Sequence, residues 1–140
     1  MTIGLDSNAL FAALVHEAER HAAVTQWLNA NHLKLVTTGT NIAEVLRLVT
    51  HPAICQKPLT LNKALATLEQ LLNNYHIAVL PEAEQWWQPL AKMVSGADTL
   101  TGNQVHDARI ALCFKFHGVA TVCTYDGDFK TFGFKKLIQP

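Results

Sequence analysis

Four acidic residues that are far apart in the sequence stand beside short apolar segments. They are Asp6, Glu44, Asp107 and Asp126. Carboxylates that a fold brings together without cations repel one another, so a protein that gathers them usually holds a divalent metal ion there. Oxygen ligands of this kind suit Mg²⁺ or Mn²⁺, whereas histidine and cysteine would favour zinc. The four positions therefore predict metal-dependent chemistry on a phosphate group.

Two of these acids also have ordinary structural explanations. Asp6 could cap a helix that starts near Asn8, a role that aspartate often fills. Asp126 is followed by Gly127, and this pair is a common turn signal. Neither acid indicates a metal site when it is considered alone.

Glu44 has a structural explanation of a different kind. It lies three residues after Asn41, which is the spacing of a capping box, and Arg47 could pair with it from the next helical turn.

Asp107 is harder to explain structurally. The sequence places Ile110 and Ala111 three and four residues later, so no cation would meet Asp107 on its own helix. A buried aspartate is costly unless it is paired or coordinates a metal. His106 precedes it and would point elsewhere on the helix, which favours a structural role for that histidine.

Short apolar segments alternate with helical patterns along the chain. Strands are expected at residues 3–5, 33–38, 77–80 and 119–123, with a short fifth at 136–138. Helices are expected at 8–15, 21–31, from 40 or 41 to about 50, from 61 after a Thr60 cap, at 82–94, and from 102–103 to 117. Because Pro89 interrupts the region 82–94, a kink or a late helix start is expected there.

Two helices have apolar stripes that should face the core. The first stripe is Leu61, Leu65, Leu68 and Leu72, and the second is Val105, Ala108, Leu112 and Phe116.

Strands that alternate with helices predict an α/β protein, in which a parallel sheet of four to five strands is covered on both faces. Sites in such proteins lie beyond the carboxyl ends of the strands. Asp6 and Asp126 directly follow expected strands. Glu44 and Asp107 are expected in the first turns of helices whose N-termini face the same edge.

The composition indicates one globular domain over residues 1–140, because apolar residues make up 49% and charged residues 16%. So few charges also suggest an apolar surface that a second copy or another partner covers. The formal net charge is zero, which argues against a large electrostatic footprint on nucleic acid, although Arg109 and Lys130 could steer phosphates. Three cysteines without CxxC spacing, no basic segment before an apolar stretch and no membrane-length apolar run predict a cytoplasmic protein.

Several sequence segments together resemble the PIN domain, and the fuller pattern is similar to VapC-type toxins of bacterial toxin–antitoxin systems. The matching segments are LDSN at residues 5–8, NIAEVLR at 41–47, LRLVTHP at 46–52, GNQVHDA at 102–108 and TYDGDF at 124–129. Their order and spacing make the resemblance specific, and it spans essentially the whole chain. One minor departure is Ser7, which stands where threonine is common and keeps the hydroxyl group.

The resemblance implies a PIN fold and a Mg²⁺- or Mn²⁺-dependent endoribonuclease that cleaves structured or translation-related RNA, often tRNA. It further implies a homodimer and a cognate antitoxin that folds over the groove, commonly placing a basic side chain among the acids. The residues that match metal-binding acids are Asp6, Glu44, Asp107 and Asp126, and those that match additional site positions are Asp128, Thr124 and Asn8. On this hypothesis Asp6, Asp107 and Asp126 hold one or two ions, and Glu44 is a further ligand or orients the attacking water.

Two alternatives stay open. The first is a PIN-like module that has lost catalysis and binds RNA or a protein partner; it would bind RNA equally well in EDTA, and the complete acidic set argues against it. The second is a receiver-like phospho-acceptor, which needs paired acids after the first strand and a lysine near a late strand. Only Asp6 follows the first strand here.

Overall fold

The computed structural model describes residues 1–93 and 100–140 and consists of a parallel sheet between two layers of helices. The strands are β1 (Thr2–Leu5), β2 (Lys34–Thr38), β3 (Ala78–Leu80), β4 (Thr121–Cys123) and β5 (Lys136–Ile138). The helices are α1 (Ser7–Leu14), α2 (His21–Ala30), α3 (Gly39–Val49), α4 (Leu61–Asn74), α5 (Leu90–Met93) and α6 (Asn103–Phe116), and a 3-10 helix η2 spans Gly127–Phe132.

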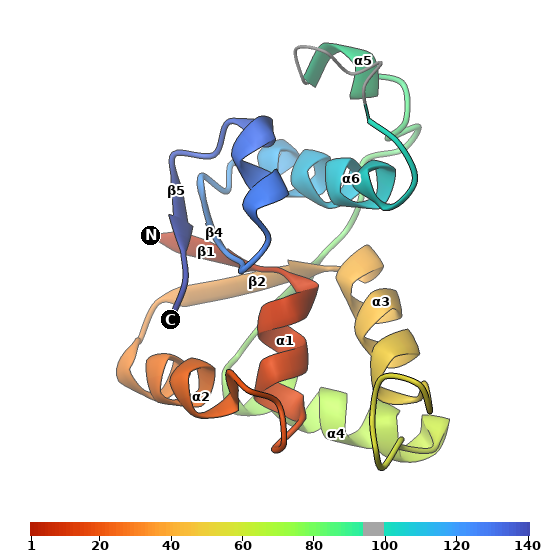
Figure 1. The fold of residues 1–140 in the computed structure, drawn as a ribbon. Helices are drawn as coiled ribbons and strands as arrows, with labels where there is room; N and C mark the ends of the chain where they lie inside the picture. The colour runs from red at the N-terminus through yellow and green to blue at the C-terminus, as the bar shows by residue number, and fades with distance from the viewer. Residues whose placement is uncertain (94–99) are drawn as a thin grey trace.

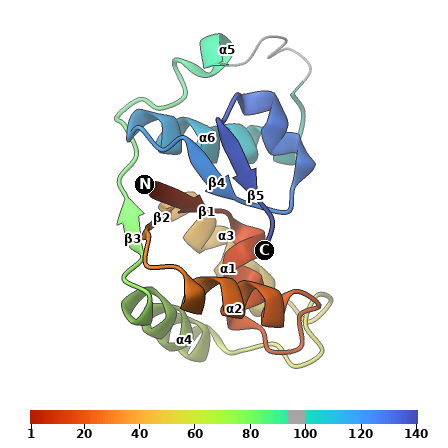
Figure 2. The same cartoon turned by 90° about the vertical axis from the view of Figure 1, so that its left-hand side faces the viewer.

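All five strands pair in parallel in the order β3-β2-β1-β4-β5 (Figure 2). The registers pair Ile3 of β1 with Leu35 of β2 and with Thr121 of β4. The chain therefore forms the predicted three-layer α/β architecture. Because every strand points the same way, all their carboxyl ends meet at one edge of the sheet.

The two faces of the sheet carry separate apolar cores, since alternate residues of a strand point to opposite faces. Helices α1 to α4 lie on one side of the sheet and α6 lies on the other (Figure 1). Leu35 and Cys123 belong to the core on the α1 side, and their neighbours Val36 and Val122 belong to the core on the α6 side.

The helix boundaries agree with the sequence analysis except between β3 and α6. Residues 84–89 form turns, and α5 begins only after Pro89, at Leu90, which is the expected late start. Proline suits the position just before or at the start of a helix because its nitrogen has no hydrogen to donate. Residue 94, the expected end of this helix, lies outside the described residues.

The predicted apolar stripe of α4 is partly wrong. Ala64, Leu68 and Leu71 are buried, whereas Leu61 and Leu65 are 58% and 41% exposed. The leucine-rich surface of α4 is wider than the face that packs against α1 and α3, so part of it remains in contact with solvent.

The predicted apolar face of α6 is wrong at three of its four positions. Ala108 is buried as expected, but Val105 and Phe116 are exposed and Leu112 is only partly buried. The helix instead buries the side that carries Phe114, whose ring packs against Gly4 of β1. An added Cβ at Gly4 would lie 2.8 Å from that ring, so the ring occupies space that a side chain at this position would take.

Helix length and apolarity give no candidate for a bilayer-crossing segment in the part of the chain that the structure describes.

Candidate functional site

The acidic residues converge at the carboxyl edge of the sheet, as the sequence predicted. Asp6 directly follows β1, and its backbone N–H donates to the carbonyl of Cys123, the last residue of β4, at 3.0 Å. Asp126 lies in the loop after β4. Glu44 and Asp107 enter from α3 and α6. These helices begin at Gly39 and Asn103, so both acids lie in the second turn and not in the expected first turn.

Asp6 is held by four hydrogen bonds although only 4% of its surface is exposed. Its Oδ1 accepts from the Ser7 backbone N–H at 2.8 Å and from the Asn41 side-chain amide at 3.1 Å. Its Oδ2 accepts from the Thr124 hydroxyl at 2.7 Å and from the Asn8 amide at 3.3 Å. These donors fix the orientation of the carboxylate, and the Ser7 bond confirms that Asp6 also caps α1.

Asn41 is a site residue that the sequence analysis misassigned. Thr38 caps α3, since its hydroxyl accepts from the Asn41 N–H at 3.2 Å, so the expected capping box of Asn41 and Glu44 is wrong. Asn41 is fully buried and donates to both Asp6 and the Ser7 hydroxyl. A signal was present, because Asn41 lies four and eight residues before the buried Val45 and Val49, which places a polar side chain on the core face of the helix.

Thr124 and Asn8 link Asp6 to the loop that carries Asp126. The Thr124 hydroxyl, which donates to Asp6, accepts from the Asn8 amide at 3.2 Å and from the Asp126 backbone N–H at 3.0 Å. The side-chain Oδ1 of Asn8 accepts from the Tyr125 backbone N–H at 3.1 Å. The structure thus places both polar residues beside the acids.

Asp107, Asp126 and Asp128 form the tightest acidic group. One carboxylate oxygen of each lies within 4.8 Å of the others. Asp126 caps η2 by accepting from the Asp128 N–H at 2.9 Å, so its expected role in a turn coexists with its place in this group. Asp6 and Glu44 lie outside the group but close enough to affect its charges, because both raise the pKa of Asp107.

The pKa values of two acids measure this crowding. Burial raises the pKa of Asp6 from 3.8 to about 6, while the hydrogen bonds from Thr124 and Ser7 oppose that rise. The pKa of Asp107 is raised to about 7, first by burial and then by the negative charges of Asp6, Asp126 and Glu44. A hydrogen bond with Asp126 raises the Asp107 pKa further, so burial, the three acids and this bond all disfavour the charged form of Asp107.

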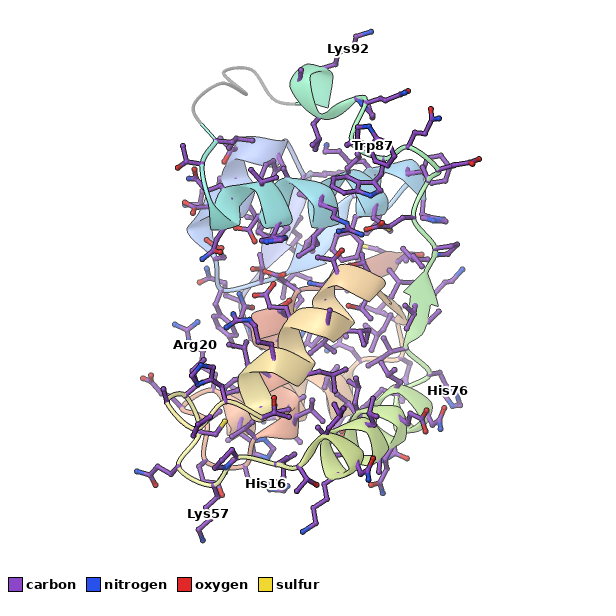
Figure 3. All side chains as sticks on the ribbon, turned by 90° about the vertical axis from the view of Figure 1, so that its right-hand side faces the viewer. His16, Arg20, Lys57, His76, Trp87 and Lys92 are labelled. Carbon is purple, nitrogen blue, oxygen red and sulfur yellow. The ribbon has the colours of Figure 1, made fainter. Side chains whose placement is uncertain are left out.

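A cleft of about 660 Å³ opens between α3 and α6 beside these carboxylates. Figure 3 shows both helices on one face of the molecule, with α6 above α3. The walls of the cleft include Glu44, Arg47, His106, Asp107, Arg109 and Asp126. His106 therefore faces the cleft, and the expectation that it points elsewhere on the helix is wrong. Glu44 and Arg47 do not form the expected ion pair; within residues 1–93 and 100–140 the ion pair formed is that of Arg109 with Glu82.

Arg109 on the α6 wall binds neighbouring side chains, although its own side chain is 34% exposed. Its Nε and Nη2 donate to the two carboxylate oxygens of Glu82 at 2.6 and 2.8 Å, which is a bidentate pair. The guanidinium carbon lies 4.3 Å from the ring centroid of Trp86, and Thr40 donates to the same Glu82 at 3.1 Å. This arrangement ties the segment after β3 to both walls of the cleft. That Arg109 steers phosphates stays a prediction.

The donor set at this edge fits a divalent cation. Among the described residues, the carboxylates of Asp107, Asp126 and Asp128 lie close together and form no ion pair with a basic side chain. Burial and mutual repulsion raise the Asp107 pKa. A hard cation would relieve both costs, and carboxylates are the ligands that such ions prefer. The cluster is thus of the kind that binds a divalent metal.

Comparison with known sequences identifies the class of protein. The sequence model of the PIN domain family matches residues 3–135. The chain therefore belongs to the PIN domain family, in agreement with its fold and with the motifs that carry the four acids.

Particular relatives extend this assignment. Ribonuclease VapC48 of Mycobacterium tuberculosis, from strains CDC 1551 and H37Rv, is 34% identical over 95 residues. The match covers 68% of this chain and 65% of the relative, so it spans less than two thirds of the relative's length.

Solved structures share the fold. Mycobacterium tuberculosis VapC20, described as a sarcin-ricin loop cleaving toxin, has a TM-score of 0.74 at 17% identity and covers 99% of both chains. VapBC2 from Rickettsia felis, bound to a DNA fragment from its promoter, has a TM-score of 0.66 at 16% identity and covers 99% of this chain and 98% of that one. FitAcB from Neisseria gonorrhoeae has a TM-score of 0.66 at 20% identity, with coverage of 97% and 96%.

Proposed function

We propose that this protein is a Mg²⁺- or Mn²⁺-dependent endoribonuclease and the toxin of a toxin–antitoxin pair, acting on structured or translation-related RNA. The observation that carries the proposal is the group of carboxylates, two of them with raised pKa values, at the carboxyl edge of a PIN sheet. The similarity to ribonuclease VapC48 and to the VapC20 toxin supports both the activity and the substrate class.

In the proposed site, Asp6, Asp107 and Asp126 hold the cation, and Asp128 is close enough to be a further ligand. A bound divalent cation would lower the pKa of a water molecule and stabilise the charge that develops on the scissile phosphate. Glu44 reaches the cleft from α3, where it either contacts the cation or orients the attacking water. No residue needs to form a covalent intermediate with the RNA.

The surrounding residues keep these groups in place. Asn41 and Thr124 hold the two oxygens of Asp6, so its carboxylate cannot rotate away. Hydrogen bonds that orient metal ligands typically contribute 10–100-fold to metal affinity or activity.

The proposal is tested by incubating the purified protein with total RNA in Mg²⁺, in Mn²⁺ and in EDTA, and by mapping the new RNA ends. We expect discrete cleavage that needs the cation and is lost in Asp107→Asn. Glu69→Gln is a matched control, because Glu69 is an exposed acid on α4, remote from the cleft. Cleavage that persists in EDTA or in Asp107→Asn would contradict the mechanism. RNA binding that is equal with and without the cation, with no cleavage at all, would favour the inactive PIN-like module.

We further propose that the chain is a single PIN domain that works in the cytoplasm as a homodimer with a cognate antitoxin. The exposed leucines of α4 and the exposed Val105 and Phe116 of α6 are apolar surfaces that such partners would cover. Multi-angle light scattering of the purified chain tests the dimer. The antitoxin is tested by searching for a short upstream reading frame that encodes a DNA-binding protein and by co-expressing that protein with this chain. We expect the two proteins to co-purify.

A further inference from the structure

The cleft carries an arginine on each wall, and the two differ in what they already bind. Arg109 on α6 uses Nε and Nη2 on Glu82 and stacks over Trp86. Arg47 lies on the opposite wall, in the last turn of α3, and its side chain is exposed. Among residues 1–93 and 100–140, no carboxylate pairs with Arg47 and no acceptor takes a hydrogen bond from its guanidinium. Arg47 is therefore available to a ligand in the cleft, whereas two of the three guanidinium nitrogens of Arg109 already bind Glu82.

The position of Arg47 relates it to the acidic residues. It is three residues after Glu44, so the two side chains lie on neighbouring turns of the same helix face. Both line the cleft together with Asp107 and Asp126. A ligand that reaches the carboxylates therefore passes close to this guanidinium.

A nucleic-acid backbone needs a cation at this point. The carboxylates around Asp107 repel phosphates, and a bound metal would compensate only the phosphate that it contacts. The neighbouring phosphate of the strand would still face an acidic wall. A guanidinium suits that phosphate, because its planar donors match two phosphate oxygens at once and it stays charged at every physiological pH.

We propose that Arg47 binds the RNA phosphate next to the scissile one and so holds the strand in register with the carboxylates. This inference rests on the proposed ribonuclease function. It assigns substrate binding to α3, and it leaves Arg109 to hold the segment with Glu82 and Trp86 against the cleft wall. A contact of this kind is the same before and during bond cleavage, so it affects KM and leaves kcat almost unchanged.

The first experiment compares Arg47→Gln, Arg47→Lys and a matched control, Lys57→Gln, on a short unpaired RNA that contains one mapped cleavage site. Lys57→Gln also removes one positive charge, and Figure 3 shows Lys57 far from the cleft, beyond α3. We expect Arg47→Gln to raise KM about tenfold with kcat within about twofold, because a charge-assisted hydrogen bond to phosphate is lost. The salt dependence of log KM should weaken by about 0.7, the value for one phosphate contact on a single strand. Arg47→Lys should recover part of the loss.

Equal KM and equal salt dependence in Arg47→Gln and Lys57→Gln would overturn the proposal. So would a fall in kcat alone, because that would place Arg47 in the chemical step. Mg²⁺ titration followed by thermal melting should give Arg47→Gln at least the wild-type affinity for the ion. A weaker affinity would show that Arg47 supports the acidic site and not the RNA.

A second experiment locates the phosphate. In a binding assay by fluorescence anisotropy, RNA oligonucleotides carry a neutral methylphosphonate at one position at a time. The wild type and Arg47→Gln should bind equally when the neutral group is next to the cleavage site and should differ at every other position. A difference that is independent of position would refute the contact. If the wild type binds RNA but never cleaves it, the proposed ribonuclease fails, and a difference between the two proteins that disappears at one single position would still show that Arg47 contacts one phosphate.

Discussion

The two sides of the acidic site solve the same electrostatic problem in different ways. On the β1 side, the buried Asp6 accepts four hydrogen bonds, which oppose the rise of its pKa that burial causes. On the α6 side, Asp107 meets Asp126 and Asp128, and burial together with the charges of Asp6, Asp126 and Glu44 raises its pKa. The first side is rigid before any ion binds, whereas the second side reaches a low energy only with protons or a cation. The comparison teaches that the hydrogen bonds that orient a carboxylate and the repulsion that favours an ion are unevenly divided between the two sides.

The largest expected effect separates these roles. Asp6→Asn and Asp107→Asn should each lower RNA cleavage by about 10²–10³-fold, since each removes a carboxylate that would hold the cation, and the cation is what stabilises the reacting phosphate. Their metal-free stabilities should differ. Asp107→Asn should raise the Tm at pH 8, because it removes repulsion. Asp6→Asn should raise the Tm less than Asp107→Asn does, because the burial cost that it removes is offset by an amide nitrogen that faces buried donors at a cost of about 1–3 kcal/mol.

Differential scanning fluorimetry in EDTA measures both melting temperatures. An Asp6→Asn variant that is stabilised as much as Asp107→Asn would show that the two sides are equivalent.

Thr124→Val tests whether rigidity on the β1 side matters for activity. The substitution keeps the shape but removes the hydroxyl that donates to Asp6 and accepts from the Asp126 N–H. We expect cleavage to fall by about 10–100-fold, the usual effect of a residue that orients a metal ligand. Thr124→Ser should retain most of the activity, and an equal loss in Thr124→Ser would point to packing of the methyl group.

The pH dependence of stability tests the α6 side. The pKa of Asp107 is about 7 in the folded protein and near 3.8 when unfolded, so the folded state binds more protons between these values. Stability of the metal-free protein should therefore increase as the pH falls from about 8 toward 4. Urea unfolding at several pH values measures it, and Asp107→Asn should show a flatter dependence. Mg²⁺ should stabilise the wild type most at high pH, where protons do not compete for the carboxylates.

The smallest expected effect concerns Glu82, a nearby carboxylate that is already compensated. The pKa of Glu82 is lowered by the hydrogen bonds from Arg109. The contribution of Glu82 to folding stability is therefore present above pH 4.5 and is lost as the pH falls. Glu82→Gln should cost less than about 1 kcal/mol at pH 7, as is usual for partly exposed ion pairs. Urea titrations at pH 7 and pH 3 check this, and a cost that persists at pH 3 would mean that packing and not charge is responsible.

Much of the fold could be predicted because its signals are local. The five strands are short apolar segments between helical patterns, and a parallel sheet necessarily brings residues that follow β1 and β4 to one edge. This is why Asp6 and Asp126 could be expected to meet. Whether the acids act in catalysis stays a prediction until the variants are measured.

The rest depends on contacts that periodicity does not encode. Helix α6 has apolar residues on more than one side, and the choice of Phe114 over Phe116 for the core depends on the space above Gly4. The pairing of Arg109 with Glu82 joins residues that are 27 positions apart, so no local pattern reveals it. Asn41 was visible as a polar residue at a buried helical spacing, but its partner Asp6 was not.

The close approach of Phe114 to Gly4 has a consequence for how the acids are spaced. Asp6 follows the strand that contains Gly4, and Asp107 lies on the helix that contains Phe114. The thickness of the layer between β1 and α6 thus sets the distance across which the two carboxylates face each other. The absence of a side chain at Gly4, two residues before Asp6, lets β1 and α6 approach closely, and on the proposed function this closeness would let both halves of the site reach one ion.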